Sequence, residues 1–149
     1  MALILQNKYC LYFLKTTWDI QYKQFMISMK ILIIDDEELI CWSLKRSIEK
    51  YEGYSVTCVH SGTEAVEKAV KNKYDLIITD LRLPDLSGAE IVKKIRELNI
   101  DTPVMMMSAF LSPEVKSDIT NYGIVNFINK PFQIEEIIGS INKTSLQNP

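Results

Sequence analysis

Short apolar runs alternate with amphipathic stretches along the chain from Lys30 onward. Five of these runs have the length and composition of β-strands, at residues 30–34, 54–59, 74–79, 103–108 and 124–129. Segments such as "LII" and "VMMM" are apolar at consecutive positions, which is typical of strands that are covered on both faces. The alternation therefore predicts an α/β fold, a doubly wound five-stranded parallel sheet with five helices.

The amphipathic stretches carry the start and stop signals of helices. We expect helices over residues 37–52, 61–72, 87–98, 112–122 and 134–141. Ser61 and Glu64 have the spacing of a capping box at the start of the second helix. The fourth helix is rich in Ser, Thr and Asn, so its intrinsic helix propensity is weak. Its apolar residues Val115, Ile119 and Tyr122 recur at helical spacing and are expected on one face.

The length of the chain limits it to one folded domain. Its 149 residues provide one core of ordinary size and little besides. The pattern places this domain at residues 29–143, with a C-terminal tail at 144–149. Residues 1–28 have no clear period and form an N-terminal extension. This extension is either translated without a role, or an arm whose Tyr, Phe and Leu side chains pack on the domain or on a partner.

Charge and cysteine content exclude several classes of protein. The formal net charge of -2 gives no basic face for nucleic acid, so direct DNA binding is not expected. Three cysteines without a CxxC spacing suggest neither a disulfide framework nor a zinc site, and reduced thiols fit a cytoplasmic protein. The apolar segment "YCLYFLK" is far shorter than the roughly 20 residues that span a bilayer, so we expect no membrane anchor.

Polar side chains follow four of the five predicted strands. Asp35 and Asp36 come after the first strand, Asp80 after the third, Ser108 at the end of the fourth and Lys130 after the fifth. In a doubly wound sheet, ligands bind outside the carboxyl ends of the strands, where the strand order reverses. We therefore expect these side chains to converge on one site. Each of them alone has an ordinary explanation such as a helix cap, and only their conjunction favours a functional site.

The chemistry of this set favours a magnesium ion and phosphoryl transfer. Carboxylates about 4 Å apart repel by roughly 4 kcal/mol per pair at an effective dielectric constant of about 20, so they need a compensating cation. Oxygen ligands without His or Cys favour Mg²⁺, which leaves coordination positions open for a phosphoryl oxygen. Asp80 would then act as a nucleophile towards phosphorus. Lys130 would neutralise charge on the transferring group, and the Ser108 hydroxyl would hydrogen-bond to it.

The motifs "ILIIDDEE", "LIITDLRLPDLSG", "MMMSAF" and "FINKPF" together resemble the receiver domain of two-component response regulators. The resemblance covers about residues 29–143 and implies a flavodoxin-like fold with strand order 2-1-3-4-5. It also implies that Asp80 is the phosphoacceptor and that Asp36 is a direct Mg²⁺ ligand. Asp35 would hold the ion mainly through water, and the backbone carbonyl of Arg82 would complete the protein ligands with Asp80.

The resemblance further implies a conformational switch. Ser108 and Lys130 would hold the phosphoryl group, and the hydroxyl residue would move towards it. An aromatic residue three positions before the lysine, here Phe127, would rotate inward behind that hydroxyl. Because phenylalanine has no hydroxyl group, this coupling would depend on packing, and an ordinary core role for Phe127 is an equal alternative.

The function implied by the resemblance is that of a single-domain response regulator. It would take a phosphoryl group from a sensor histidine kinase or a histidine phosphotransfer protein. It would then signal to another protein through the face made by the helix at 112–122, the strand at 124–129 and the last helix. A phosphorelay carrier that passes the group to another histidine is the near alternative.

An enzyme of another class is a further alternative. A Mg²⁺-dependent phosphatase of the haloacid-dehalogenase type also uses an aspartate nucleophile at a strand end. That family has a DxD motif where this chain has Asp35, Asp36 and Glu37. We therefore expect no enzyme activity beyond the protein's own phosphorylation and dephosphorylation.

Overall fold

The computed structural model describes residues 29–110 and 112–147, so the interpretations of residues 1–28 and of 148–149 lie outside it. Strands and helices alternate along this range as predicted. The strands are β1 (Met29–Ile34), β2 (Tyr54–Val59), β3 (Leu76–Asp80), β4 (Val104–Ser108) and β5 (Ile124–Asn129). The helices are α2 (Glu38–Ile48), α3 (Gly62–Lys71), α4 (Gly88–Glu97), α5 (Pro113–Thr120) and α6 (Ile134–Gln147).

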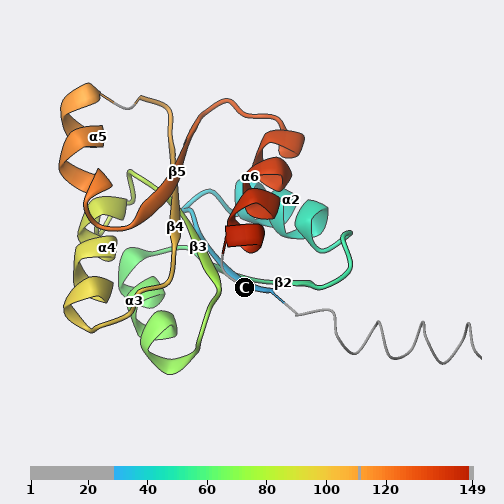
Figure 1. Cartoon of the computed structure of the whole chain (residues 1–149), viewed down its shortest axis with the longest axis horizontal. Coiled ribbons are helices and arrows are strands. Elements are labelled where there is room, and N and C mark those ends of the chain that lie inside the picture. The colour runs from blue at the N-terminus through green and yellow to red at the C-terminus, as the bar shows by residue number, and fades with distance from the viewer. Residues whose placement is uncertain (1–28, 111, 148–149) are drawn as a thin grey trace, which may run out of the picture.

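The strands form one parallel sheet in the order β2-β1-β3-β4-β5, which confirms the predicted topology. Figure 1 shows the two helix layers, with α2 and α6 on one face of the sheet and α3, α4 and α5 on the other. The strand order reverses at β1, which pairs with both β2 and β3. The carboxyl ends of β1 and β3 therefore flank the position where this class of fold binds its ligands.

Two apolar clusters, one on each face of the sheet, join the helices to the strands. Side chains of a strand point alternately to the two faces. In β1, Ile31 and Ile33 belong to the cluster under α2 and α6, whereas Leu32 and Ile34 belong to the cluster under α3, α4 and α5. All four are fully buried, and each contributes about 1.5–3 kcal/mol of burial free energy. This packing fixes the strand ends that carry the predicted site.

Two helix ends differ from the predicted ones. α2 ends at Ile48 and not at residue 52, because the chain turns back into β2 and Gly53 adopts a φ of 90° in that turn. α6 continues to Gln147, so residues 144–147 are helical and do not form a separate tail. Thr144 is buried there, and its hydroxyl donates to a carbonyl one turn earlier at 3.0 Å.

The helix α5 buries less of its apolar face than the sequence predicts. Ile119 is buried, but Val115 and Tyr122 are 37% and 38% exposed. With eight residues, α5 is the shortest helix of the described range, and only part of it contacts the core. Val125 on the neighbouring β5 is 45% exposed as well. These three residues leave an apolar surface at α5 and β5.

Candidate functional site

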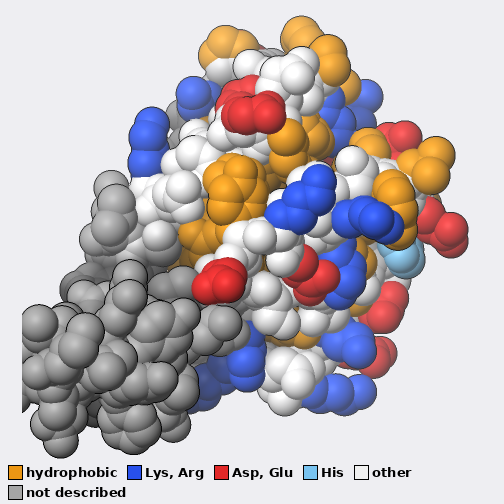
Figure 2. All heavy atoms as spheres, turned by 90° about the vertical axis from the view of Figure 1, so that its right-hand side faces the viewer, with side chains coloured by type: hydrophobic (Ala, Val, Ile, Leu, Met, Phe, Trp, Pro, Cys, Tyr) orange, Lys and Arg blue, Asp and Glu red, His pale blue; other side chains and the backbone are white. Residues whose placement is uncertain are grey.

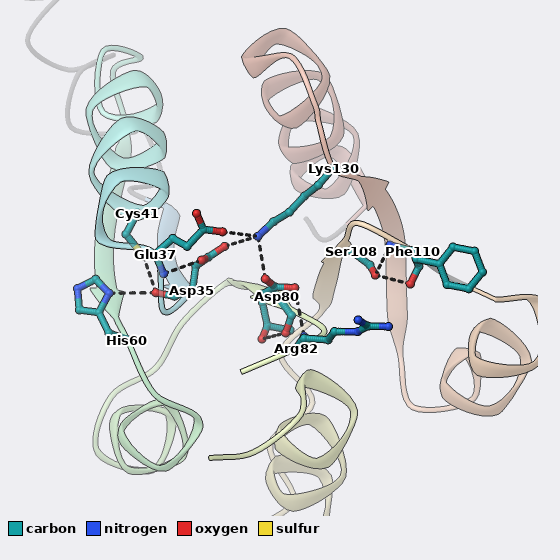
Figure 3. Close-up of polar contacts among 10 residues, drawn as sticks. Asp35, Glu37, Cys41, His60, Asp80, Arg82, Ser108, Phe110 and Lys130 are labelled. Atoms are coloured by element: carbon teal, nitrogen blue, oxygen red, sulfur yellow. Dashed lines mark hydrogen bonds and ion pairs between the residues drawn. The ribbon is translucent and has the colours of Figure 1, made fainter. Parts of the chain in front are cut away.

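Three charged side chains from separate strands meet at the carboxyl edge of the sheet. Asp35 follows β1, Asp80 ends β3 and Lys130 follows β5. The Lys130 ammonium nitrogen (Nζ) lies 2.8 Å from Asp35 Oδ2 and 2.7 Å from Asp80 Oδ2 (Figure 3). The predicted convergence of strand ends is confirmed for these three residues.

These ion pairs are largely shielded from water. The exposed fraction of the side chain is 14% for Lys130, 12% for Asp80 and 0% for Asp35. Burial alone would disfavour the ammonium, but its hydrogen bonds to Asp35 and Asp80 outweigh that effect and raise the pKa of Lys130. Lys130 therefore stays charged between two carboxylates that would otherwise repel each other.

Asp36 adds a third, exposed carboxylate to the group. One oxygen atom from each of Asp35, Asp36 and Asp80 lies within 4.8 Å of the other two. A set of carboxylate oxygens that is open to water on one side suits Mg²⁺, which binds few carboxylates and keeps several waters. These residues therefore fit the predicted ion.

The backbone around Asp80 holds its carboxylate in place. Asp80 Oδ1 accepts a hydrogen bond from the Arg82 amide at 3.2 Å (Figure 3). The Thr79 hydroxyl donates to the Asp80 carbonyl at 2.9 Å. A Cβ atom at Gly88 would collide with this same carbonyl, so only glycine lets the start of α4 approach the strand end so closely. Arg82, whose carbonyl is a predicted metal ligand, is thus held beside Asp80 by its own amide.

Ser108 is buried at the end of β4, but its hydroxyl is engaged elsewhere. The hydroxyl donates to the Phe110 carbonyl at 2.6 Å and accepts from the Phe110 amide at 3.1 Å. Figure 3 shows this pair to one side of Asp80 and Lys130. The Ser108 carbonyl accepts from the Lys130 amide at 2.8 Å. In the described contacts, however, the Ser108 hydroxyl bonds only to Phe110 and not to the charged side chains.

Phe127 is half-buried on β5 and packs against the cluster under α3, α4 and α5. The Lys116 ammonium lies 5.3 Å from the centroid of its ring, a cation–π distance. The ring is thus in contact with the α5 side of the sheet. It is neither a fully buried core residue nor a neighbour of the Lys130 ion pairs.

Three further residues touch the site and are missed by sequence reasoning. Glu37 Oε1 lies 4.0 Å from Lys130 Nζ, although its position predicts only a helix start. His60 Nδ1 donates to the Asp35 carbonyl at 3.0 Å, and the Cys41 thiol approaches the same carbonyl at 3.4 Å. His60 could have been found, because it follows β2 at the same edge of the sheet. Cys41 could not, because its role depends on how α2 packs.

Comparison with known protein families matches residues 31–142 to the response regulator receiver domain. The chain belongs to this family. The matched range runs from within β1 to within α6 and includes all the strand ends described above. The resemblance identified from four sequence motifs is therefore confirmed, and the protein is a receiver of two-component signalling.

Relatives of this receiver include regulatory proteins of Bacillus and Staphylococcus. The uncharacterized transcriptional regulatory protein YkoG of Bacillus subtilis is 40% identical over 118 residues, which cover 79% of this chain and 51% of YkoG. The response regulator ArlR of Staphylococcus aureus (strain Mu50) is 35% identical over 120 residues, covering 80% of this chain and 54% of ArlR. The receiver thus spans about half the length of these curated relatives.

Solved structures show the same fold. The receiver domain of the Francisella response regulator 1452 superposes with a TM-score of 0.75 at 33% identity, covering 81% of this chain and 99% of that one. The response regulator TrrA of Thermotoga maritima, solved in complex with Mg²⁺-BeF, gives a TM-score of 0.68 at 29% identity, covering 78% and 98%.

None of the helices in residues 29–110 and 112–147 is both long enough and apolar enough to cross a membrane.

Proposed function

We propose that this receiver accepts a phosphoryl group on Asp80 from a phosphohistidine of a partner protein. The observation that carries the proposal is the 2.7 Å contact between Lys130 Nζ and Asp80 Oδ2, at the edge where Asp35 and Asp36 also lie. A carboxylate that attacks phosphorus needs positive charge beside it, because the transferring group is itself negatively charged. Lys130 supplies that charge.

The proposed reaction is a direct displacement. A bond forms between a carboxylate oxygen of Asp80 and phosphorus, and the bond between phosphorus and the donor's histidine nitrogen breaks, with its electron pair leaving on that nitrogen. Lys130 neutralises charge at the acceptor oxygen throughout. The Ser108 hydroxyl reaches the phosphoryl group only after it gives up its hydrogen bonds to Phe110.

Asp35, Asp36 and Asp80 would hold a Mg²⁺ ion, with the carbonyl of Arg82 as a further ligand. When bound, the ion would draw negative charge from the phosphoryl oxygens. The mutual approach of the three carboxylates supports this assignment, and so does the solved complex of TrrA with Mg²⁺-BeF. Asp35 is oriented for this role because its Oδ1 accepts from the Glu37 amide at 2.9 Å.

A kinase or histidine phosphotransfer protein needs a docking surface beside Asp80. An apolar hollow next to Lys130 is lined by Ile40, Ala109, Pro131 and Phe132. A second hollow continues it along α2, where Leu39 is 81% exposed. Figure 2 shows that acidic and basic side chains are mixed on the side of the molecule that carries α2 and α6. Apolar contacts, more than a field of one sign, would therefore select the partner.

A protein donor and a small-molecule donor of the phosphoryl group together distinguish an effect on docking from an effect on the chemical step. Leu39→Arg should slow transfer from a phosphorylated histidine kinase about tenfold, since an arginine in an apolar contact would bury a charge without a partner. It should leave phosphorylation by acetyl phosphate, which needs no docking surface, unchanged. Leu98→Arg is the matched control, because Leu98 is also an exposed leucine and follows α4. Equal slowing with both donors would contradict a docking role.

The apolar surface at α5 and β5 supports the predicted output face. Val115, Tyr122 and Val125 are exposed there, and Phe127 lies between this surface and the core. We propose that phosphorylation changes this face and so the binding of a target protein.

Two further parts of the proposal concern the cellular location of the protein and the kind of output it gives. The free thiols of Cys41 and Cys58 support the predicted cytoplasmic location, and Cys10 lies outside the described residues. The receiver spans about half the length of YkoG and ArlR. A stand-alone output role, the alternative of a relay carrier and the absence of DNA contact therefore stay predictions.

Mass spectrometry after incubation with acetyl phosphate and Mg²⁺ tests the acceptor. The protein should gain an acid-labile adduct of about 80 Da, the mass of one phosphoryl group, and Asp80→Asn should not. Asp75→Asn is the matched control, since Asp75 precedes the same strand at its opposite end and accepts only the Lys30 amide in the described contacts. The same adduct on Asp80→Asn would overturn the assignment.

A further inference from the structure

Asp85 lies in the loop between β3 and α4, but its carboxylate binds the start of a different helix. Its Oδ1 accepts from the Gly62 amide at 2.9 Å. Its Oδ2 accepts from both the amide and the hydroxyl of Thr63, each at 2.8 Å. Gly62 and Thr63 are the first two residues of α3, whose own N-cap, Ser61, satisfies only the amide of Glu64. Asp85 thus joins two segments that are more than 20 residues apart in sequence.

The charge of Asp85 suits this position. Free amides at a helix start favour an anion. The hydrogen bonds from Gly62 and then from Thr63 hold the pKa of the Asp85 carboxyl well below its usual range. The carboxylate is therefore ionised at neutral pH, where its charge favours the hydrogen bonds to α3.

The loop that Asp85 holds is the one that orients the acceptor. It begins directly after Asp80, and its Arg82 amide donates to Asp80 Oδ1 at 3.2 Å. The Leu81 amide bonds to the Met107 carbonyl at 2.8 Å. The fit against α3 is tight, because a Cβ atom at Gly62 would lie 2.6 Å from the Leu86 Cβ.

The residues that lead into α3, where the Asp85 carboxylate binds, also contact the Asp35 side of the site. The chain enters α3 from β2 through His60, whose Nδ1 donates to the Asp35 carbonyl at 3.0 Å. The Asp35 amide in turn bonds to the Val59 carbonyl at 3.3 Å. On one side, contacts therefore connect Asp35 through His60 and α3 to Asp85. On the other side, the loop of Asp85 leads through Arg82 and Asp80 to Lys130, which contacts Asp35 and closes the path. Figure 3 shows the part of this path from His60 to Arg82 that passes through Lys130.

We propose that Asp85 is a positioning residue for phosphoryl transfer: by tying the loop after β3 to the start of α3, it holds Asp80 and Arg82 at a fixed place relative to Asp35. The proposal deepens the phosphoacceptor function and rests on it. Asp35 follows β1 and Asp80 ends β3, and in the described contacts Lys130 and this tie both connect the two sides of the site above the sheet. A small displacement of a reacting group lowers the rate of such reactions strongly.

The test compares Asp85→Ala with Ser61→Ala. Both variants remove a cap from the start of α3, but only Asp85→Ala also frees the loop that carries Arg82. Without metal or phosphoryl donor, hydrogen exchange of the Arg82 amide should become about tenfold faster in Asp85→Ala and stay unchanged in Ser61→Ala. With acetyl phosphate, the Mg²⁺ concentration for half-maximal rate should rise about fivefold and the maximal rate should fall about tenfold in Asp85→Ala alone. Thr63→Ala, which removes one of the three hydrogen bonds, should give a smaller change in the same direction.

Two results would overturn the proposal. One is an Asp85→Ala protein with the Arg82 exchange, half-maximal Mg²⁺ concentration and maximal rate of the unaltered protein. The other is an equal loss in Ser61→Ala, which would reduce Asp85 to a helix cap. Failure of the phosphoacceptor function itself would look different, because the unaltered protein would then gain no phosphoryl group, while the exchange of the Arg82 amide would still report on the tie.

Discussion

The two halves of the predicted site are built in different ways. On the β1 and β3 side, Asp35, Asp80 and Lys130 are already in contact across three strands. On the β4 side, Ser108 is bound within its own loop to Phe110. One half is thus assembled in the structure, whereas the Ser108 hydroxyl would have to leave Phe110 before it could take the role proposed for it.

The kind of interaction explains this difference. Buried carboxylates are costly unless a cation meets them, and hydrogen bonds between charged groups are roughly twice as strong as neutral ones. A serine hydroxyl satisfies itself with the nearest backbone groups, here two residues away. The charged side chains therefore pair across strands, whereas the neutral Ser108 hydroxyl bonds locally.

The largest expected effect is that of removing the shared cation. Lys130→Met should slow phosphorylation by acetyl phosphate by about 100-fold or more, because the ammonium beside the acceptor carboxylate is lost. In the absence of metal it should also cost about 3 kcal/mol of unfolding free energy, since the Asp35 and Asp80 carboxylates lose their partner. Mass spectrometry over time measures the phosphorylation rate, and urea titration measures the free energy of unfolding. Lys71→Met is the control, because Lys71 pairs with Glu67 on the surface of α3.

A smaller effect should follow from removing the exposed carboxylate of the assembled half. Asp36→Asn should weaken Mg²⁺ binding about tenfold or more, because it removes the charge of a carboxylate that would bind the ion directly. The rise of the unfolding temperature with Mg²⁺ concentration measures this binding. Glu38→Gln, which changes a nearby carboxylate in the first turn of α2, should keep the full response. An undiminished response in Asp36→Asn would remove this residue from the metal site.

The smallest effect on the unphosphorylated protein should come from a change in the half of the site that contains Ser108. Ser108→Ala should lower the unfolding free energy by about 1 kcal/mol, the worth of an ordinary hydrogen bond. It should slow phosphorylation only about threefold to tenfold, because this hydroxyl contacts the phosphoryl group only after its loop rearranges. Ser112→Ala, which removes the N-cap of α5, is a control for loop stability. A rate loss in Ser108→Ala as large as that of Lys130→Met would mean that both halves are assembled from the start.

The assembled half is also the half that the sequence predicts best. The strand-end rule finds Asp35, Asp80 and Lys130 because strand positions follow from apolar runs, and parallel strands end at one edge. The pairing of Ser108 with Phe110 does not follow from that rule, since a hydroxyl can turn to any neighbour in reach. The contact of Asp85 with α3 does not follow from the sequence either, because it depends on which helix start packs against the loop of Asp85.

The ends of the helices and the burial of their side chains are also only partly predictable from the sequence. Ser61 is the N-cap of α3 as its spacing predicts, although the described contacts contain only one bond of the predicted capping box, from the Glu64 amide to the Ser61 hydroxyl. The end of α6 and the exposure of Val115 and Tyr122 depend on what the rest of the domain covers, which is a tertiary property.

The central claim is that Asp80 itself carries the phosphoryl group, and borohydride mapping tests it most directly. Borohydride reduces an acyl phosphate to an alcohol, so a phosphorylated aspartate becomes homoserine while free carboxylates stay intact. After treatment with acetyl phosphate and Mg²⁺, reduction and peptide sequencing by mass spectrometry, we expect homoserine at position 80. Homoserine at position 35 or 36 instead, or at none of these positions, would contradict the account.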